Sequence, residues 1–177
     1  MITIGLAIIT FNEEAKIAEV LESTSFVDQK VVVDSYSTDR TVEIAKKYKA
    51  TVIEREWQGY ADQKQFCLDQ INTDWVLVLD GDECLTKELQ TEIQNLLKGQ
   101  PKFDAYQLKR HLIFLGKELK HGRGRDKQLR LFKNGAGKYS QRNIHEEILV
   151  NCEVGELAGP ILHYSSANIQ AEIDKIT

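Results

Sequence analysis

The sequence predicts an α/β domain with a mostly parallel central sheet, helices on both faces of that sheet, and an antiparallel extension. Two observations predict this fold. Short apolar runs alternate with segments of helical spacing through the first hundred residues, and this alternation stops after Pro101. Strand–helix repetition is typical of a parallel sheet with right-handed crossovers. A chain of 177 residues, 42% of them hydrophobic, has the size of one domain with a substantial core. We therefore expect one domain over residues 1–177.

Apolar runs rich in β-branched residues are the expected parallel strands. They are Ile2–Ile9, Lys30–Asp34, Ala50–Glu54 and Trp75–Leu79. Nearly continuous apolar runs are typical of strands that are covered on both faces. Apolar residues recur at helical spacing in four other segments, Glu13–Glu22, Thr41–Tyr48, Ala61–Ile71 and Thr86–Lys98. Thr10 and Glu13 have the spacing of a capping box, which predicts that the first helix starts directly after the first strand.

The second half of the chain has a different pattern. Strands are predicted over Phe103–Leu115 and Gln128–Phe132, and a turn over Asn134–Gly137. The segment His121–Lys127 is predicted to be a loop, and it carries three cations within seven residues. Such a loop either binds anionic groups through charge-assisted hydrogen bonds or is simply solvated, and the sequence leaves both interpretations open.

Composition excludes several classes of protein. The formal net charge of −4 argues against a general nucleic-acid binder, whose surface would be basic. No apolar run approaches the ~18 residues that a membrane-spanning helix needs, and Met1–Thr10 lacks the pattern of a signal peptide. Cys67, Cys84 and Cys152 are widely spaced, so we expect three small buried residues in a reducing cytoplasm.

Asp80-Gly81-Asp82 directly follows the apolar run that ends at Leu79. Residues i and i+2 of an extended chain point the same way, so two carboxylates are expected together at the carboxyl end of a strand. Gly81 lets the backbone turn there and leaves room for a ligand. Two carboxylates suit Mg²⁺ or Mn²⁺ held jointly by protein and phosphate oxygens. A solvated acidic turn is the alternative interpretation.

The first two predicted strands also end in polar residues, at Thr10-Phe11-Asn12-Glu13-Glu14 and at Asp34-Ser35. Ligands of open α/β sheets bind beyond the carboxyl ends of the strands, where these side chains are expected. Helix capping would explain Thr10 and Asn12 equally well. Capping does not readily explain Asp34, which could accept hydrogen bonds from a base or a ribose.

Taken in order, these motifs resemble those of glycosyltransferase family 2. The residues that carry the resemblance are Thr10–Glu14, Val33–Thr41, Trp57–Tyr60 with Gln63 and Lys64, Leu79–Glu83, Arg130–Phe132, His145–Glu147 and Ile161–Ser165. The resemblance extends from about Ile4 to Ser166. Within the family, the chain is similar to a subgroup that contains lipopolysaccharide or lipooligosaccharide core β-1,4-glucosyltransferases. The resemblance implies the nucleotide-diphospho-sugar transferase fold, known as the A-type glycosyltransferase fold. Residues 1–100 would then bind the nucleotide sugar and residues 101–166 the acceptor.

The resemblance also implies a site for a UDP-sugar. The residues expected to bind it are Thr10, Asn12, Glu14, Asp34, Ser35, Lys64, Asp80 and Gly81. Asp34 would contact the base and Lys64 would reach the diphosphate. Asp82 would be the principal ligand of Mg²⁺ or Mn²⁺, with Asp80 beside the ribose and the metal. His163 would complete the metal site, although an isolated histidine is more often a hydrogen-bonded core residue.

Glu146 is the expected general base. An inverting transfer needs a carboxylate on the acceptor side that takes the proton of the attacking hydroxyl. Glu147 stands where many relatives have Asp, so either glutamate is a candidate, and Asp126 is a third. An isolated Glu-Glu pair would ordinarily be interpreted as a solvated edge.

The resemblance implies that a hexose, expected to be glucose, moves from a UDP-sugar to a lipid-linked or core oligosaccharide of the cell envelope. The expected location is the cytoplasm, which is compatible with peripheral attachment to the inner membrane. One alternative is transfer to a polyprenyl phosphate. A nucleotidyltransferase is disfavoured because the first strand is not followed by a Gly-rich loop. Residues 167–177 have the pattern of a helix that relatives continue, so a UDP-sugar-binding domain with little turnover is a further alternative.

Overall fold

The computed structural model describes residues 1–119, 125–140 and 146–164. Its helices are α1 (Ile17–Ser23), α2 (Thr41–Lys47), α3 (Tyr60–Asp69) and α4 (Lys87–Lys98). Its first strands are β1 (Ile4–Thr10), β2 (Gln29–Asp34), β3 (Thr51–Glu54), β4 (Trp75–Asp80) and β5 (Glu83–Leu85). The later strands are β6 (Ala105–Phe114), β7 (Lys117–Glu118), β8 (Arg125–Lys133), β9 (Gly137–Tyr139), β10 (Ile148–Val150) and β11 (Val154–Tyr164).

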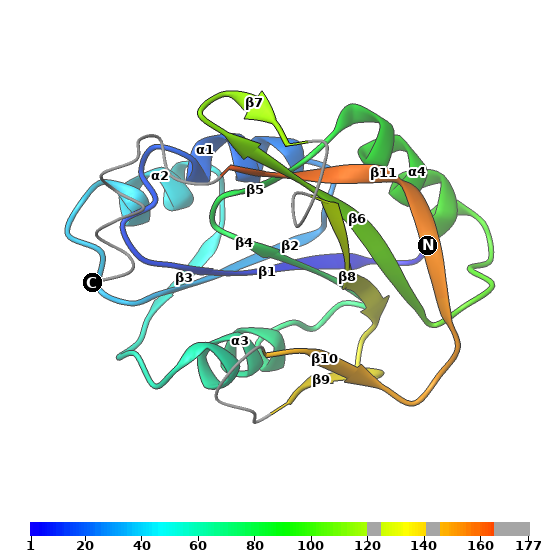
Figure 1. The fold of residues 1–177 in the computed structure, drawn as a ribbon. Coiled ribbons are helices and arrows are strands. Elements are labelled where there is room, and N and C mark those ends of the chain that lie inside the picture. Colours follow the sequence, from blue (N-terminus) through cyan, green and yellow to red (C-terminus); the bar gives the residue numbers. More distant parts are fainter. Residues whose placement is uncertain (120–124, 141–145, 165–177) are drawn as a thin grey trace.

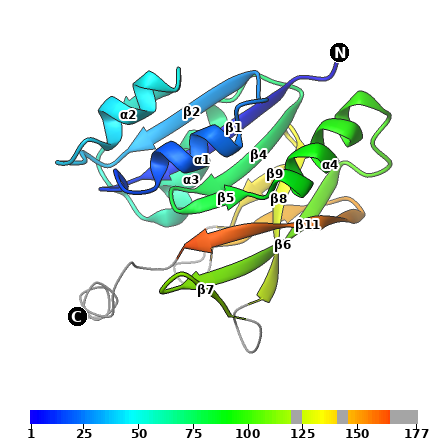
Figure 2. The same cartoon turned by 90° about the horizontal axis from the view of Figure 1, so that it is seen from above.

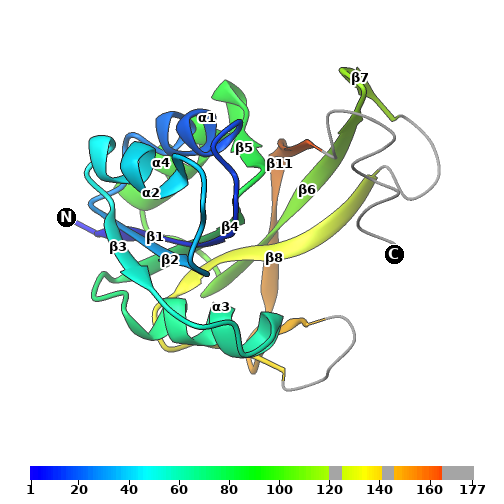
Figure 3. The ribbon, with the colours of Figure 1, turned by 90° about the vertical axis from the view of Figure 1, so that its left-hand side faces the viewer.

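One large sheet organises the molecule. Its strand order is β3-β2-β1-β4-β8-β6-β11-β5, and β7 pairs with β6. The strands from β3 to β4 are parallel, whereas β8 is antiparallel to both of its neighbours. β11 then runs parallel to β6 and antiparallel to β5. Figure 3 shows β6, β8 and β11 curving away from the parallel part. The predicted α/β fold with a parallel part and an antiparallel extension is confirmed.

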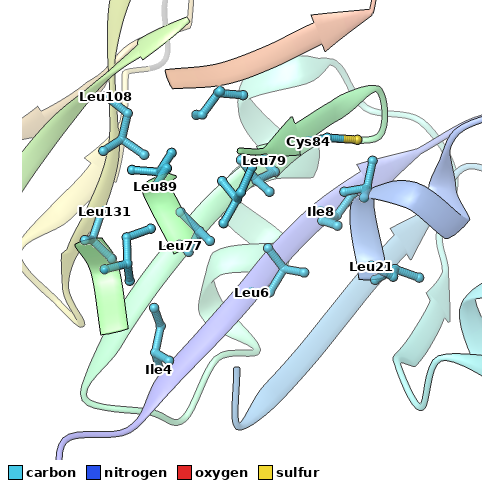
Figure 4. Close-up of a cluster of buried hydrophobic side chains, with 14 of the residues drawn as sticks. Ile4, Leu6, Ile8, Leu21, Leu77, Leu79, Cys84, Leu89, Leu108 and Leu131 are labelled. Carbon is cyan, nitrogen blue, oxygen red and sulfur yellow. The ribbon is translucent and has the colours of Figure 1, made fainter. Parts of the chain in front are cut away.

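Helices cover both faces of the parallel strands (Figure 1). Ile4, Leu6 and Ile8 of β1 belong to the core cluster that also contains residues of α1 and α4, as Figure 4 shows. Ala7 belongs to the opposite cluster, with Cys67 of α3. Successive strand residues point to opposite faces, so both faces of β1 are buried. This explains why the strand is a nearly continuous apolar run.

α4 lies beside β11 on the face that it shares with α1 and α2 (Figure 2). Its buried residues Leu89, Ile93 and Leu97 follow the predicted helical spacing. The Thr86 side chain caps its first turn by accepting a hydrogen bond from Leu89 N at 3.3 Å.

The predicted capping box at the first helix is wrong. α1 begins at Ile17, and its N-cap residue Lys16 makes no side-chain cap. The Thr10 hydroxyl instead donates to Asp34 Oδ1 at 2.9 Å, because the fully buried Asp34 carboxylate needs hydrogen-bond donors. Glu13 N likewise donates to Thr41 Oγ1, at 2.8 Å.

Two further predictions need correction. Arg125–Lys127, predicted to lie in a loop, form the start of β8, where they pair with β6; residues 121–124 lie outside the described residues. Cys152 is exposed, because it lies just beyond β10, whereas Cys67 and Cys84 are buried as expected. Burial raises the pKa of both buried thiols to about 12. The helix predicted for residues 167–177 also falls outside the described part of the chain.

Candidate functional site

The carboxyl ends of β1, β2 and β4 lie side by side. Strand pairing places Thr10 beside Asp34 and Ile9 beside Asp80. The Asp34 carboxylate accepts hydrogen bonds from Thr10 Oγ1 at 2.9 Å, Ser37 N at 2.7 Å and Ser37 Oγ at 2.6 Å. Asp34 therefore lies behind Thr10 and joins the end of β1 to the loop after β2.

Asn12 and Glu14 join the same two loops. Asn12 has a positive φ of 53°, which Asn tolerates better than most residues, and its Oδ1 accepts a hydrogen bond from Thr38 N at 2.9 Å. Glu14 Oε2 accepts from Arg40 N at 3.1 Å and from Arg40 Nε at 3.2 Å. Neither side chain lines the cavities described below. In this structure both side chains hold the loop after β1 against the loop after β2.

A cavity of about 660 Å³ opens beyond the carboxyl ends of these strands; we call it the aromatic pocket. Six of the residues expected from the sequence line it, namely Thr10, Ser35, Asp80, Gly81, Asp82 and His163. Phe11, Trp57 and Tyr60 also line it, with exposed fractions of 57%, 45% and 61%. The Trp57 and Tyr60 rings meet edge to face, with centroids 4.6 Å apart. The pocket thus offers flat apolar surfaces beside carboxylates, which suits a ring attached to a cation or to an anion that a metal ion bridges to the carboxylates.

Gly81 lies in close contact with the end of β1 and the residues after it. A Cβ at this position would lie 3.0 Å from Glu13 Cγ and 3.3 Å from Thr10 Cγ2. Gly81 thus lines the aromatic pocket and also lies close to Thr10 of β1 and to Glu13. This close approach holds the turn after β4 against the end of β1.

Asp82 and His163 meet on the wall of the aromatic pocket. Asp82 Oδ2 and His163 Nε2 are 3.3 Å apart. β11 pairs with β5, so His163 lies opposite Glu83, and Tyr164 N donates to Asp82 O at 3.0 Å. Burial disfavours the charged form of His163, but the Asp82 carboxylate outweighs that effect and raises the pKa of His163.

The Asp82–His163 contact should make stability depend on pH. The pKa of His163 is raised in the folded state, so its stabilising contribution is complete below the unfolded pKa of about 6.5. We expect that contribution to be lost as the pH rises through the folded pKa. Urea unfolding of the metal-free protein and of His163→Gln, at pH values from about 5.5 to 9, would measure it. Parallel stability curves for the two proteins would contradict this expectation.

The donor atoms present fit a metal ion only in part. Among the described residues, no group of three Asp, Glu, His or Cys side chains could hold an ion. Asp82 and His163 offer one oxygen and one nitrogen, while both Asp80 oxygens already contact cations. A divalent ion here would need further oxygens from a phosphate ligand and water, which is how Mg²⁺ usually binds. The residues therefore fit an ion held jointly with a diphosphate.

Asp80 belongs to a buried network of charges. Lys64 Nζ lies 2.8 Å from Asp80 Oδ1, and Arg130 Nη2 lies 3.1 Å from Asp80 Oδ2. The same Arg130 nitrogen is 2.9 Å from Glu83 Oε1, and Glu83 has no exposed surface. Burial would raise the pKa of Asp80, but Arg130 and Lys64 outweigh it and hold that pKa well below its usual value. At Glu83 burial prevails over Arg130, so its pKa is raised.

A second cavity of about 430 Å³, which we call the charged pocket, adjoins the aromatic pocket. Asp80 and Arg110 line both cavities. Glu146 and Glu147, the two expected bases, lie here just before β10, and Glu146 Oε1 is 3.0 Å from Lys64 Nζ. Lys64 lines this cavity and thereby connects Glu146 to Asp80.

Asp126, the third candidate base, is held by Arg110 instead. Its Oδ2 lies 2.7 Å from Arg110 Nη2, and its Oδ1 accepts from Arg110 Nε at 2.9 Å. Burial would raise the pKa of Asp126, but Arg110 outweighs it, so the pKa is lowered. A carboxylate whose pKa is lowered in this way is a weakened proton acceptor.

Sequence reasoning did not identify the roles of Arg110, Arg130 and Glu83. Arg130 had a signal, because it interrupts the apolar run Leu129–Phe132 and a charge inside such a run needs a buried partner. Glu83 follows the Asp80–Asp82 motif directly, in the short strand β5, which the sequence did not predict. Two buried polar atoms, Arg130 Nε and the Tyr139 hydroxyl oxygen, have no hydrogen-bond partner within the described residues.

Known proteins resemble this chain over most of its length. The sequence model of glycosyl transferase family 2 matches residues 6–154. An uncharacterised glycosyltransferase of Rickettsia typhi is 34% identical, over 97% of this chain and 63% of its own length. The lipopolysaccharide core biosynthesis glycosyltransferase LpsC of Rhizobium meliloti is 33% identical, over 95% of this chain and 65% of its own length. The chain thus spans less than two thirds of either relative.

A solved structure shares the fold. Residues 1–349 of S. aureus TarS, crystallised in complex with UDP-GlcNAc, superimpose with a TM-score of 0.68. The superposition covers 94% of this chain and 59% of TarS, with 17% sequence identity. At this identity the likeness concerns the fold alone.

Proposed function

Since the chain belongs to glycosyltransferase family 2, we propose that it moves a hexose from a UDP-sugar to a saccharide hydroxyl with inversion at the anomeric carbon. Glucose is the proposed hexose, and the proposed acceptor is a lipid-linked or core oligosaccharide of lipopolysaccharide or a related cell-envelope glycan. The resemblance to core glucosyltransferases and the 33% identity to LpsC support this choice. A lipid-linked acceptor would bring the protein to the cytoplasmic face of the inner membrane.

One observation carries the proposal: the Asp80-Gly81-Asp82 motif and His163 line a pocket at the carboxyl ends of β1, β2 and β4 that also contains exposed aromatic rings. Open α/β sheets bind ligands at this edge, and about 660 Å³ is an ordinary size for a ligand pocket. The UDP-sugar would lie here, with its rings against Trp57 or Tyr60 and its diphosphate toward Asp82. Asp34 would then act near the nucleotide base by holding the Thr10 side chain in place. Asn12 and Glu14 would act by holding the adjoining loops together.

Asp82 and His163 would hold Mg²⁺ or Mn²⁺ together with the diphosphate. When bound, such an ion neutralises the charge that develops on the departing UDP. Asp80 would contribute through Lys64 and Arg130, which keep it ionised beside the ribose and the diphosphate. Lys64, which lines the charged pocket and contacts Asp80, would reach toward the diphosphate from there.

Glu146 would take the proton from the acceptor hydroxyl as its oxygen attacks the anomeric carbon. The bond between that carbon and the diphosphate oxygen breaks, and UDP leaves with the bonding electrons. Glu146 lies in the charged pocket, while Asp82 lies in the aromatic pocket, and Asp80 is common to both. Inversion would require the acceptor hydroxyl at Glu146 to approach the anomeric carbon from the face opposite the diphosphate. Glu147, in the same pocket, is the second candidate base.

Two alternatives remain distinct proposals. A polyprenyl phosphate acceptor is already anionic and needs no strong base. A domain that binds UDP-sugars with little turnover would keep the aromatic pocket but transfer slowly. None of the helices in the described residues has the length and hydropathy needed to cross a bilayer.

Calorimetric titration of UDP-glucose, UDP-galactose and GDP-mannose, each with and without Mn²⁺, tests the donor site. We expect metal-dependent binding of one UDP-sugar, and at least about tenfold weaker binding by Asp82→Ala, because the leading oxygen ligand is lost. Asp104→Ala is the control, since Asp104 is exposed and lines neither pocket. Unchanged binding by Asp82→Ala would contradict the proposed metal site, and absence of binding by all three donors would contradict the donor class.

A further inference from the structure

The charged pocket is lined by more polar side chains than the proposed reaction uses. The proposed reaction uses Glu146, Lys64, Asp80 and Arg130 from this cavity, yet Lys127, Gln128 and Tyr139 also line it. The pocket shares Asp80 and Arg110 with the aromatic pocket. A ligand in the charged pocket would therefore lie next to a sugar nucleotide in the aromatic pocket.

Within the described part of the chain, each of the four cations that line the charged pocket is paired with a carboxylate. Lys64 contacts Asp80 and Glu146, and Arg130 contacts Asp80 and Glu83. Arg110 forms a two-point pair with Asp126, whose closer contact is 2.7 Å. Lys127 Nζ lies 2.7 Å from Glu156 Oε2. The positive charge of these four described side chains is thus largely neutralised.

Glu147 is the lining carboxylate that makes no ion pair within the described part of the chain. A phosphate entering the pocket would have to compete with carboxylates for the paired cations and would face the Glu147 charge. A sugar hydroxyl meets neither obstacle, because it donates to carboxylates and accepts from ammonium and guanidinium groups. The pocket therefore suits a neutral polyhydroxylated ring better than an anion.

We propose that the charged pocket is the subsite of the acceptor, that it takes an uncharged sugar residue, and that Glu147 makes it select against phosphate-bearing sugars. This inference rests on the proposed function, because it assigns the sugar whose hydroxyl meets Glu146. It also distinguishes a neutral saccharide acceptor from a polyprenyl phosphate.

NMR titration tests this subsite. The probes are the methyl glycosides of glucose, galactose and mannose, their 6-phosphates, and inorganic phosphate. UDP and Mg²⁺ are kept saturating so that the aromatic pocket is filled, and UDP binding is measured in parallel. At least one unphosphorylated glycoside should bind at least about threefold more tightly than its 6-phosphate. A threefold difference in the dissociation constant is the effect expected of one partly screened charge contact.

Two variants show whether Glu147 causes this preference. Glu147→Lys should abolish or reverse the preference and let inorganic phosphate compete with the glycoside. Glu153→Lys changes the net charge by the same amount, but Glu153 is an exposed residue outside both pockets. This variant should therefore keep the wild-type preference for the unphosphorylated glycoside. A preference that both variants change to the same degree would overturn the role of Glu147.

The other outcomes separate this inference from the proposed function. Tighter binding of the 6-phosphates, or competition by inorganic phosphate in the wild type, would overturn the neutral acceptor and favour an anionic one. Binding of UDP without binding of any glycoside would overturn the subsite alone. Failure to bind UDP would overturn the proposed function and, with it, this inference.

Discussion

Replacing Glu146 by Gln is expected to lower the rate of hexose transfer by about 10²–10⁴-fold without weakening UDP binding. The amide oxygen of Gln can still accept a hydrogen bond from Lys64, which lies 3.0 Å from the Glu146 carboxylate, so local packing should be retained. The amide cannot accept the proton of the attacking hydroxyl. The rate of UDP release with saturating acceptor, together with the dissociation constant of UDP, measures both parts of the expectation.

Glu147→Gln and Asp126→Asn are the matched controls for this experiment. Glu147 lines the same pocket, and Asp126 is held by Arg110, so each variant should lose much less activity than Glu146→Gln. A larger loss in Glu147→Gln would transfer the role of base to that residue. Nearly full activity in all three variants would instead support an anionic acceptor that needs no base.

Replacing Arg130 by Met is expected to lower the free energy of unfolding by about 3–5 kcal/mol, because it leaves two carboxylates without their main partner in a buried site. Glu83 has no exposed surface, and Arg130 Nη2 is 2.9 Å from its Oε1. The pKa of Glu83 is raised by burial even with Arg130 present, so its charge is costly. Urea unfolding monitored by circular dichroism measures the loss.

The double variant Glu83→Gln, Arg130→Met is the control for this prediction. It removes the uncompensated charge at Glu83, so it should recover part of the stability lost in Arg130→Met. Lys133→Met, which replaces an exposed cation of the same strand, should change stability by no more than about 0.5 kcal/mol. A loss below about 1 kcal/mol in Arg130→Met would show that solvent screens the network.

Local patterns in the sequence determined much of the fold. The apolar runs that became β1, β2 and β4 were recognised because both faces of these strands are buried, so most of their residues are apolar. The helical spacing of α4 was equally clear. The position of Asp80 and Asp82 at the end of β4 followed directly. A motif that adjoins a recognisable strand in the sequence also lies at the end of that strand in the sheet.

Contacts between distant segments were decided only by the tertiary structure. Lys64 reaches Glu146 across 82 residues, and Arg130 reaches Asp80 across 50. The capping box failed for the same reason, since Thr10 binds Asp34, which is 24 residues away. The spacing of apolar residues along the chain indicates which face of a strand or helix a side chain occupies. The residue with which that side chain forms a hydrogen bond or ion pair depends on which strands become neighbours. The sequence by itself therefore determined the strands and the acidic motif, while the packing of β8, β11 and β10 around them decided the charge network and the two pockets.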